Sequence, residues 1–500
     1  MTQAKRLRIA VIGAGFAGIS CLRVLDAFGH DVTVFEKEPD VGGVWAASRR
    51  YPGLTTQNPG DTYFLSELPM PKDYPEWPEG HQVQKYMADY VSHFGLDDRV
   101  KLGCEVTSAV QGVDGTWALS VATNGGASKL IEQPYDYLIV ANGIFSRPMV
   151  PQYVGQEEFK QAGGQIFHTS EFPDRSAAAG KDVLVIGYGK SSCDVANAIK
   201  GEAKSVNVIA RNLIWKIPKM VGKVLNFKHL FLTRMGEGLF RYINVRGFER
   251  FLHSPLGLPI RNGMLGTVQG IVGWQLKLKQ IGLHPNKKLE TIARSTVSLV
   301  TDGFYEGVLA GKIGVEKNTE IIALEGKHAV LKNGKRLPVD TIVAGTGWIQ
   351  EVPFFDSNMN AQVRGEGGGG DFRLYKSMVP VGVKNLAFNG YNSSFFSQLN
   401  CEIGALWIAD LLEGGQQLPS DAEQNEWIDR RLAWMRARTD GKHSRGTNII
   451  PFSMHHIDEL LRDLRLNLGP FTRFTQWLKA VDPGSYRHLL AKLKKRHSVP

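Results

Sequence analysis

The segment RIAVIGAGFAG, residues 8–18, predicts the fold of the chain. An apolar strand over 8–12 runs directly into three glycines with the spacing GxGxxG, and residues 19–28 have helical character. Glycines in this strand–turn–helix setting let the backbone approach a pyrophosphate at a helix N-terminus, where phosphate charge is favoured. A second strand over 31–35 ends in Glu36, whose carboxylate can accept hydrogen bonds from ribose hydroxyls. The segment therefore predicts a dinucleotide-binding unit.

The same pattern recurs at 187–192 (GYGKSS), after an apolar strand over 182–186. Ser192 replaces the third glycine and is still small. The next strand, 205–210, ends in Arg211, at the position where the first unit has an acid. An acid would repel a 2′-phosphate, whereas a guanidinium offers forked, charged donors, so we expect NADPH here. A surface arginine that happens to follow a strand is the alternative.

Two dinucleotide sites in one chain indicate a flavin in one site and a nicotinamide cofactor that delivers hydride to it in the other. We therefore predict an α/β protein with two dinucleotide-binding, Rossmann-like domains. A disulfide reductase would share this architecture but needs a pair of cysteines. The four cysteines are far apart and form no CxxC, which also excludes a zinc ribbon: Cys21, Cys104, Cys193 and Cys401. No metal site is predicted.

The composition is that of a globular protein: 500 residues, 43% of them hydrophobic and 22% charged. The polar residues 1–8 run directly into a strand, so we expect no signal peptide. No apolar run of about 18 residues occurs, so we expect no membrane-spanning helix. These features and the sparse cysteines predict a cytoplasmic location.

Positive charge is concentrated in one part of the chain. The formal net charge is +10, and between residues 219 and 279 ten Lys and Arg face two Glu. Phe231, Met235 and Leu239 recur there at helical spacing, which predicts an amphipathic basic segment. Two interpretations stay open: a lid over a substrate tunnel, and a lid that also touches a membrane surface. Nucleic acid is not an expected partner, because no nucleic-acid-binding module is evident.

Further segments resemble those of a known family. Residues 42–45 (GGVW) match the GGxW segment that follows the ribose-binding acid in this family. Residues 51–59 (YPGLTTQNP) resemble the corresponding segment in the flavin-containing branch of the family. Segments 136–143 (DYLIVANG) and 340–348 (DTIVAGTGW) are apolar strands that end in glycine, letting backbone pass close to a cofactor. With these motifs, most of the chain resembles class B flavoprotein monooxygenases. This class includes flavin-containing monooxygenases and the related Baeyer–Villiger monooxygenases.

The resemblance implies a domain plan in which an NADPH-binding domain is inserted in a discontinuous FAD-binding domain. The predicted parts are a first FAD-binding part over 1–150, the NADPH-binding domain over 151–335 with a helical insertion over 219–282, a second FAD-binding part over 336–445, and a C-terminal helical tail over 446–500. The cofactor-binding residues that we predict are Gly13, Gly15, Phe16, Ala17, Gly18, Glu36, Lys37, Gly43, Val44, Trp45, Gln57, Asn58, Val106, Asn142, Gly143, Gly187, Gly189, Lys190, Ser191, Ser192, Arg211, Thr346 and Gly347.

The resemblance also implies a mechanism. NADPH reduces FAD, and reduced FAD binds O2 as a C4a-(hydro)peroxyflavin that transfers one oxygen atom to the substrate. Asn58 matches the flavin-side asparagine of the flavin-containing branch and is the predicted catalytic residue. A turn role for Asn58 stays open, because residues 58–61 (NPGD) are also a strong turn signal. His168 lies in a segment that resembles the family fingerprint, and we interpret it as structural.

We expect an NADPH-dependent monooxygenase that uses O2 to oxygenate the nitrogen or sulfur of a small amine or sulfide. A Baeyer–Villiger monooxygenase that inserts oxygen next to a ketone is the alternative. Residues 51–58 lack the Arg and Asp that the Baeyer–Villiger branch carries near its flavin. A non-catalytic dinucleotide-binding protein is the third hypothesis, and a homodimer is left open.

Overall fold

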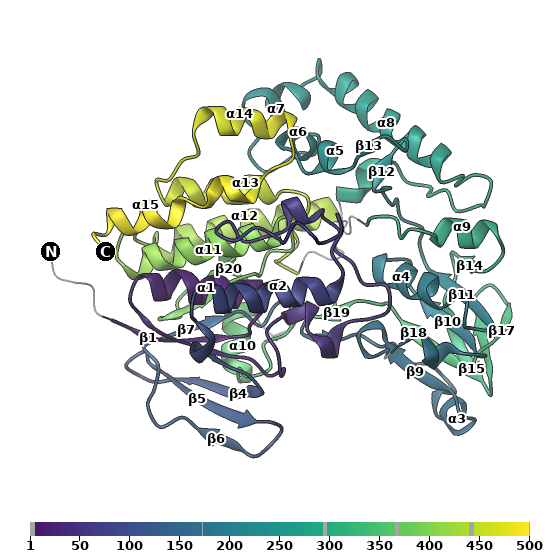
Figure 1. The fold of residues 1–500 in the computed structure, drawn as a ribbon, viewed down its shortest axis with the longest axis horizontal. Helices are drawn as coiled ribbons and strands as arrows, with labels where there is room; N and C mark the ends of the chain where they lie inside the picture. The colour runs from purple at the N-terminus through teal and green to yellow at the C-terminus, as the bar shows by residue number, and fades with distance from the viewer. Residues whose placement is uncertain (1–5, 173, 294–297, 366–369, 440–444, 500) are drawn as a thin grey trace.

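Two parallel sheets form the framework of the chain (Figure 1). The computed structural model describes residues 6–172, 174–293, 298–365, 370–439 and 445–499. The first sheet has the strand order β22-β7-β1-β2-β3, and each neighbouring pair is parallel. Its strands are β1 (Arg8–Ile12), β2 (Asp31–Phe35), β3 (Val100–Lys101), β7 (Tyr137–Val140) and β22 (Leu386–Phe388).

The second sheet repeats this arrangement with the order β14-β11-β10-β18-β9, again parallel throughout. Its strands are β9 (Gln165–His168), β10 (Asp182–Ile186), β11 (Ser205–Ala210), β14 (Gly314–Lys317) and β18 (Thr341–Ala344). In each sheet the strand before the glycine turn lies centrally, because every residue after its charged first position is apolar and the strand is covered on both faces. The predicted α/β fold with two Rossmann-like units is confirmed.

One predicted boundary disagrees with the strand pairing. The second FAD-binding part was expected to begin at residue 336, yet β18 hydrogen-bonds to β10 and β9 of the other sheet. The chain rejoins the first sheet only at β22, which pairs with β7. The apolar run of β18 is fully buried and completes the second sheet, and its sequence alone does not say which sheet it joins. We therefore propose that the NADPH-binding unit extends to about residue 345.

Helices cover both sheets. α1 (Phe16–Ala27) begins in the first glycine turn and packs against the buried α11 (Ser397–Leu412), and α4 (Lys190–Ile199) begins in the second turn. Other helices are α2 (Gly80–His93), α3 (Gln156–Gln161), α9 (Phe304–Leu309), α10 (Ser357–Arg364) and α12 (Asp421–Thr439). Small antiparallel sheets join β4 (Cys104–Gln111), β5 (Trp117–Thr123) and β6 (Ser128–Leu130), and β15 (Ile321–Glu325), β16 (His328–Leu331) and β17 (Arg336–Pro338). Shorter pairs join β8 (Arg147–Pro148) to β19 (Trp348–Ile349), and β20 (Leu374–Tyr375) to β21 (Val379–Pro380).

The helical insertion differs from the predicted amphipathic segment. It contains the hairpin β12 (Met220–Val221) and β13 (Leu225–Asn226), then α5 (Lys228–Phe231), α6 (Arg234–Gly238), α7 (Gly247–Leu252) and α8 (Leu258–Gln275). Phe231 ends α5, Met235 lies in α6, and Leu239 follows α6, so the three residues do not share one helix. Phe231 and Leu239 are buried, and so is the basic Arg234. The predicted exposed basic face is therefore wrong for residues 231–239, because this stretch packs against the C-terminal helices.

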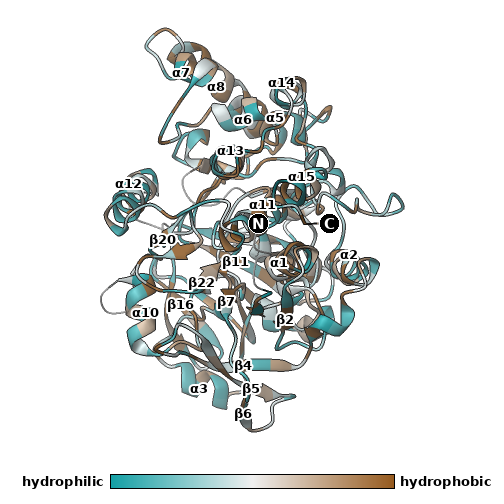
Figure 2. Ribbon diagram, turned by 90° about the vertical axis from the view of Figure 1, so that its left-hand side faces the viewer, coloured by the Kyte–Doolittle hydropathy of each residue, from teal (hydrophilic) through white to brown (hydrophobic). Residues whose placement is uncertain are grey.

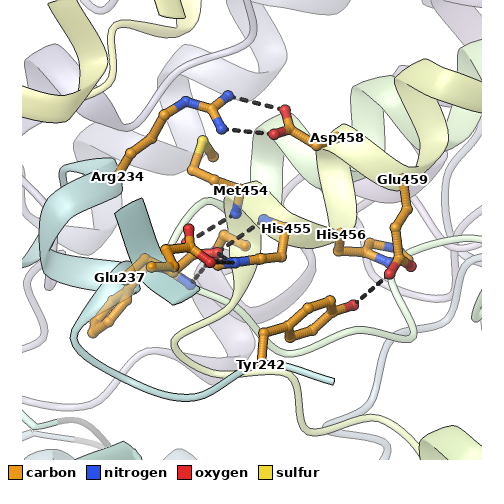
Figure 3. A network of polar contacts seen from close by, with 12 residues as sticks. Arg234, Glu237, Tyr242, Met454, His455, His456, Asp458 and Glu459 are labelled. Atoms are coloured by element: carbon orange, nitrogen blue, oxygen red, sulfur yellow. Dashed lines mark hydrogen bonds and ion pairs between the residues drawn. The ribbon is translucent and has the colours of Figure 1, made fainter. Parts of the chain in front are cut away.

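Figure 3 shows the hydrogen bonds and ion pairs that join the insertion (219–282) to the C-terminal tail (446–500). The guanidinium of Arg234 forms a bidentate pair with Asp458, at 2.7 and 2.9 Å. The carboxylate of Glu237 accepts hydrogen bonds from the backbone N–H groups of Met454 and His455 and ion-pairs with the ring of His455. Asp458 and the two backbone donors, Met454 and His455, all belong to α13 (Ser453–Asp463). Buried, paired charges thus join α6 to the tail, which ends in α14 (Pro470–Leu478) and α15 (Leu489–Arg496).

Helices α7, α8 and α14 lie at the end of the molecule opposite the β4-β5-β6 sheet (Figure 2), and large exposed apolar side chains stand on or beside them. The most exposed of these side chains are Phe248, Leu256, Ile260, Trp274, Phe471, Phe474 and Leu478, and we call these residues the α7–α8–α14 face. Phe248 of α7 contacts Trp477 of α14 with ring centroids 6.1 Å apart, which joins the insertion to the tail. Among the helices of the described ranges, none combines the length and apolar composition needed to span a bilayer.

Candidate functional site

A single large cavity of about 1580 Å³ joins the two glycine turns. Of the predicted cofactor-binding residues, those that line it are Gly13, Gly15, Phe16, Ala17, Glu36, Lys37, Gly43, Val44, Trp45, Gln57, Asn58, Val106, Asn142, Gly143, Gly187, Gly189, Lys190, Ser191, Arg211, Thr346 and Gly347. Residues from both units therefore face one space. Gly18 and Ser192 do not line it. Each is the third small residue of its turn and packs its helix against the preceding strand.

The first glycine turn holds the backbone very close to the end of β7. Gly13 has a φ of +107°, and a Cβ there would lie 2.6 Å from the carbonyl oxygen of Ala141. α1 begins directly after Gly15, with no side-chain cap at its N-terminus. Its first N–H groups and the positive end of its dipole are thus available to an anion, and the turn fits the pyrophosphate of a dinucleotide.

Glu36 lies at the end of β2, where the sequence predicts a ribose-binding acid. It is buried, and its carboxylate accepts hydrogen bonds from the backbone N–H of Ala14 at 2.6 Å and of Glu38 at 3.0 Å. Burial raises the pKa of this carboxyl, and the two backbone donors act in the opposite direction. The carboxylate is therefore fixed beside the turn, and its remaining acceptor sites can receive hydroxyl donors.

The second glycine turn has the same geometry. Gly187 has a φ of +105°, and a Cβ there would lie 2.5 Å from the carbonyl oxygen of Gly345. Ser192 donates to the carbonyl oxygens of Ile186 and Gly345, at 3.3 and 3.4 Å, and so packs where the first unit has its third glycine. A Cβ at Gly189 would meet no atom within 4 Å, so the N-terminus of α4 is open toward the cavity. This turn also fits a pyrophosphate.

Arg211 and Lys190, the two basic residues predicted to bind the cofactor in this unit, differ in their surroundings. Arg211 is exposed at the cavity rim, one residue after the end of β11. The strand register sets Ala210 opposite Lys317, and both Arg211 and Lys317 line the cavity. Lys190 has a partner already, because its ammonium contacts both carboxylate oxygens of Asp194, at 2.5 and 2.6 Å.

The segment containing the predicted catalytic residue is held at two points. The amide of Asn58 donates to the carbonyl oxygen of Phe395 at 2.8 Å, and Asn58 is only 2% exposed. The amide oxygen of Gln57 accepts a hydrogen bond from the backbone N–H of Leu299 at 3.2 Å. Asn58 and Gln57 line the cavity and are anchored to opposite sides of it, one to the start of α11 and one to the second unit.

The two chain crossings between the units lie side by side. Thr346 donates its hydroxyl to the carbonyl oxygen of Met149, whose N–H donates to the carbonyl oxygen of Gly347 at 3.0 Å. The ring of His168 contacts the same Gly347 oxygen at 3.1 Å and packs edge-on against Trp348, with centroids 4.7 Å apart. Burial lowers the pKa of His168, which favours the neutral ring. These contacts are those of a structural residue at the crossing.

Residues that the sequence analysis did not single out also belong to this site. Asp194, Tyr51 and Thr301 form a buried cluster beside the second glycine turn. Lys190 and Asp194 are four residues apart, a spacing that brings side chains together on a helix and could have indicated the pair. The contacts of Tyr51 and Thr301 join segments far apart in the chain, and no local pattern indicates them.

Comparison with known proteins agrees with this geometry. The model of the family described as "Flavin-binding monooxygenase-like" matches residues 5–462. A protein named "Probable flavin-containing monooxygenase 1" from Arabidopsis thaliana is 25% identical, over 98% of this chain and 97% of that protein. The structure of S-allyl-L-cysteine S-oxygenase from Allium sativum superposes with a TM-score of 0.64, at 18% identity, over 99% of both chains. That of cyclohexanone monooxygenase from Rhodococcus sp. Phi1, bound to NADP+, gives 0.64 at 19% identity, over 98% of this chain and 97% of that one. These two likenesses concern the fold.

Proposed function

Because this chain belongs to the flavin-binding monooxygenase-like family, we propose that it uses O2 to oxygenate a nitrogen or sulfur atom of a small organic molecule. It is an oxidoreductase, a monooxygenase that uses FAD and NADPH. When bound, FAD supplies the oxygen chemistry and NADPH the reducing electrons. The chain itself must bind both cofactors, align them and keep water away from the reacting atoms.

We assign FAD to the first glycine turn and NADPH to the second. Glu36 suits the ribose of FAD, since a fixed carboxylate accepts hydroxyl hydrogen bonds. Arg211 suits the 2′-phosphate of NADPH, because it is exposed, lines the cavity and offers a forked, charged set of donors. The shared cavity supports this assignment, because hydride transfer requires the two cofactors to meet in one space.

The observation that carries the choice of nitrogen or sulfur is the anchored amide of Asn58. Residues 51–58 hold no charged side chain, and Asn58 presents a neutral amide at the cavity wall. A neutral donor can hold an oxygen atom by hydrogen bonding without readily supplying a proton for its release. Soft nucleophiles such as amines and sulfides suit oxygen transfer in such a neutral site.

Ketone oxygenation is the second candidate, because the guanidinium groups of Arg49 and Arg445 line the same cavity next to Trp348. Arg49 lies over the ring of Trp348, 4.5 Å from its centroid, and Arg445 donates to the main-chain oxygen of Trp348. A cation near the reacting oxygen suits attack on a carbonyl group by an ionised oxygen nucleophile. Both guanidinium groups are already engaged at Trp348, which makes them less available for this task.

The deciding experiment is oxygen-dependent NADPH consumption by the FAD-loaded protein, measured with a panel of amines, sulfides and ketones. Mass spectrometry of the products should find N-oxides or sulfoxides for the preferred substrates. Esters or lactones from ketones would establish the second candidate instead. Purified protein that takes up no FAD would support a non-catalytic nucleotide-binding protein.

We also propose that the α7–α8–α14 face rests on an anionic membrane surface. The seven residues of this face are large, apolar and exposed, and a membrane surface can accept such side chains without a spanning helix. Exposed basic residues stand on the same elements or directly beside them: Arg246, Arg250, Lys277, Lys279 and Lys479. Apolar and basic groups on one face complement anionic headgroups over acyl chains.

A further inference from the structure

A buried carboxylate lies next to the second glycine turn. Asp194, one turn into α4, is 1% exposed. It accepts hydrogen bonds from the ammonium of Lys190 at 2.5 and 2.6 Å, from the hydroxyl of Thr301, and from the hydroxyl of Tyr51 at 3.4 Å. A carboxylate this deeply buried needs such a set of donors, because an unpaired charge in the interior is strongly destabilising.

The donors come from three separate parts of the chain. Lys190 belongs to the helix that begins at the proposed NADPH turn, and Thr301 follows the helical insertion. Tyr51 belongs to the first unit, in the segment that leads to Asn58. The main chain approaches closely as well, because a Cβ at Gly53 would lie 3.2 Å from the carbonyl oxygen of Asp194. Asp194 thus stands where the flavin-side segment meets the nicotinamide-side helix.

Further hydrogen bonds close to Asp194 hold segment 298–301 in place. The buried ammonium of Lys216 donates to the hydroxyl of Ser298 at 3.0 Å. The backbone N–H of Leu299 donates to the side chain of Gln57 at 3.2 Å. Together with the contact between Thr301 and Asp194, these bonds fix the segment against both units. Ser298 and Gln57 line the cavity, so the position of this segment shapes the space between the cofactors.

We infer that Asp194 is a positioning residue that aligns the NADPH-binding helix with the flavin-side segment 51–58, and so sets the distance for hydride transfer. This inference rests on the proposed use of the two turns by FAD and NADPH. Asp194 does not line the cavity and acts through Lys190, Thr301 and Tyr51. It also holds the ammonium of Lys190 against the helix, so that of the two predicted cofactor-binding residues Lys190 and Arg211, Arg211 is the exposed one.

The alternative is that Asp194 merely stabilises α4 by pairing with Lys190 four residues earlier. That role predicts a loss of stability without a change in how the two cofactors meet. Burial raises the pKa of Asp194, and the ammonium groups of Lys190 and Lys216 oppose this shift, so the charge of the carboxylate depends on its partners. An experiment must therefore separate alignment from folding.

The variants are Asp194→Asn, which keeps the shape but removes the charge, and Thr301→Val, which removes one donor to Asp194. Thr301→Ser restores the hydroxyl and serves as the rescue variant. Asp89→Asn is the matched control, because Lys85 and Asp89 form an exposed pair with the same spacing on α2, at 2.7 and 2.8 Å. Each FAD-loaded protein is tested for flavin content, thermal midpoint and NADP+ affinity by calorimetry. Anaerobic stopped-flow gives the rate of flavin reduction at saturating NADPH, and hydrogen exchange follows the amide of Leu299.

We expect Asp194→Asn and Thr301→Val to keep their FAD and to exchange the Leu299 amide faster. Flavin reduction at saturating NADPH should slow by about tenfold to a hundredfold, the effect expected when reacting groups are held about 1 Å out of place. Thr301→Ser and Asp89→Asn should match the unchanged protein. A wild-type rate in folded Asp194→Asn, or a lower thermal midpoint as its sole change, would overturn the inference. If NADPH does not reduce the flavin of the unchanged protein, the proposed function fails instead.

Discussion

The side-chain amide of Asn58 donates a hydrogen bond to the main-chain oxygen of Phe395, 337 residues away in sequence, at 2.8 Å. The bond ties the segment that follows the GGVW motif to the residue preceding the N-cap of α11. It accounts for the burial of Asn58 and uses one of its two amide hydrogens. A turn role and a role in oxygen transfer are therefore compatible in one side chain.

Replacing Asn58 by Leu should uncouple NADPH oxidation from product formation. The variant loses a preorganised donor while roughly keeping its volume, so productive oxygen transfer should fall by about a hundredfold. FAD should still bind, because the first glycine turn and Glu36 are unchanged. The measurement is hydrogen peroxide released per NADPH consumed, together with product yield.

Asn58→Asp is the companion variant, because it keeps an oxygen acceptor, removes the donor and adds a charge. Both variants leave the Phe395 oxygen without its partner, which should destabilise the fold by about 1–3 kcal/mol. Full coupling in an Asn58→Leu protein that holds FAD would mean that Asn58 is a turn residue alone.

Replacing Arg211 by Ala should weaken the binding of NADPH more than the binding of NADH. The lost charge-assisted contact should raise the KM for NADPH by the equivalent of about 1–3 kcal/mol and leave the KM for NADH nearly unchanged. Arg336→Ala is the control, since Arg336 is an exposed arginine of the same unit that pairs with Glu325, at 2.8 Å. Equal losses for both cofactors would show that Arg211 does not contact the 2′-phosphate.

His455 should make the stability of the protein pH-dependent. Its ring lies between Glu237 and Glu249, and these carboxylates raise its pKa to about 10 against the opposing effect of burial. A histidine whose folded pKa is raised stabilises the fold fully below its ordinary value, and this contribution is lost as pH rises toward 10. Between about pH 6.5 and 10, the unchanged protein should therefore lose stability as pH rises.

Thermal midpoints of His455→Leu at several pH values check this expectation. The variant should be less stable by about 3 kcal/mol near neutral pH, as expected when a buried ion pair loses one partner. The difference from the unchanged protein should shrink as pH approaches 10. His81→Leu, in an exposed pair with Glu79, should show almost no difference. A constant deficit for His455→Leu at all pH values would contradict a charged ring.

The α7–α8–α14 face should bind anionic vesicles at low salt and release them at high salt. Trp274→Ser combined with Phe471→Ser should weaken co-sedimentation, because these rings are 74% and 78% exposed and would enter the headgroup region. Val113→Ser removes an even more exposed apolar side chain outside the face and should have no effect. If the unchanged protein does not co-sediment with the vesicles at low salt, the proposed membrane contact is wrong. Sedimentation velocity then tests whether the face joins two copies instead.

Local sequence patterns were sufficient for the strands next to the two glycine turns. The predicted strands over 8–12, 182–186 and 205–210 have those same bounds in the structure. Each is a largely apolar run that ends at a turn or at a charged residue, and burial on both faces of a parallel sheet favours such a run. The family assignment was likewise confirmed, since the motifs that carry it occupy short, contiguous segments.

Features that depend on distant contacts could not be predicted in this way. The partners of Asp194 come from three segments, so neither its burial nor its contact with Thr301 has a local signal. The apolar spacing of Phe231 and Leu239 is typical of a surface helix, yet both pack inward because Arg234 finds a partner in the tail. Burial of a basic residue is favourable only when its counter-charge is supplied, and the chain supplies it more than 200 residues later.

The strand order has a consequence for how the polypeptide is made. All five strands of the second sheet precede residue 345, whereas β22 of the first sheet and the helix α11 that covers α1 lie beyond residue 385. A chain that emerges from the ribosome at about 5–20 residues per second therefore has every strand of its middle unit before the N-terminal sheet can close. The unit that begins the polypeptide is the last to be completed.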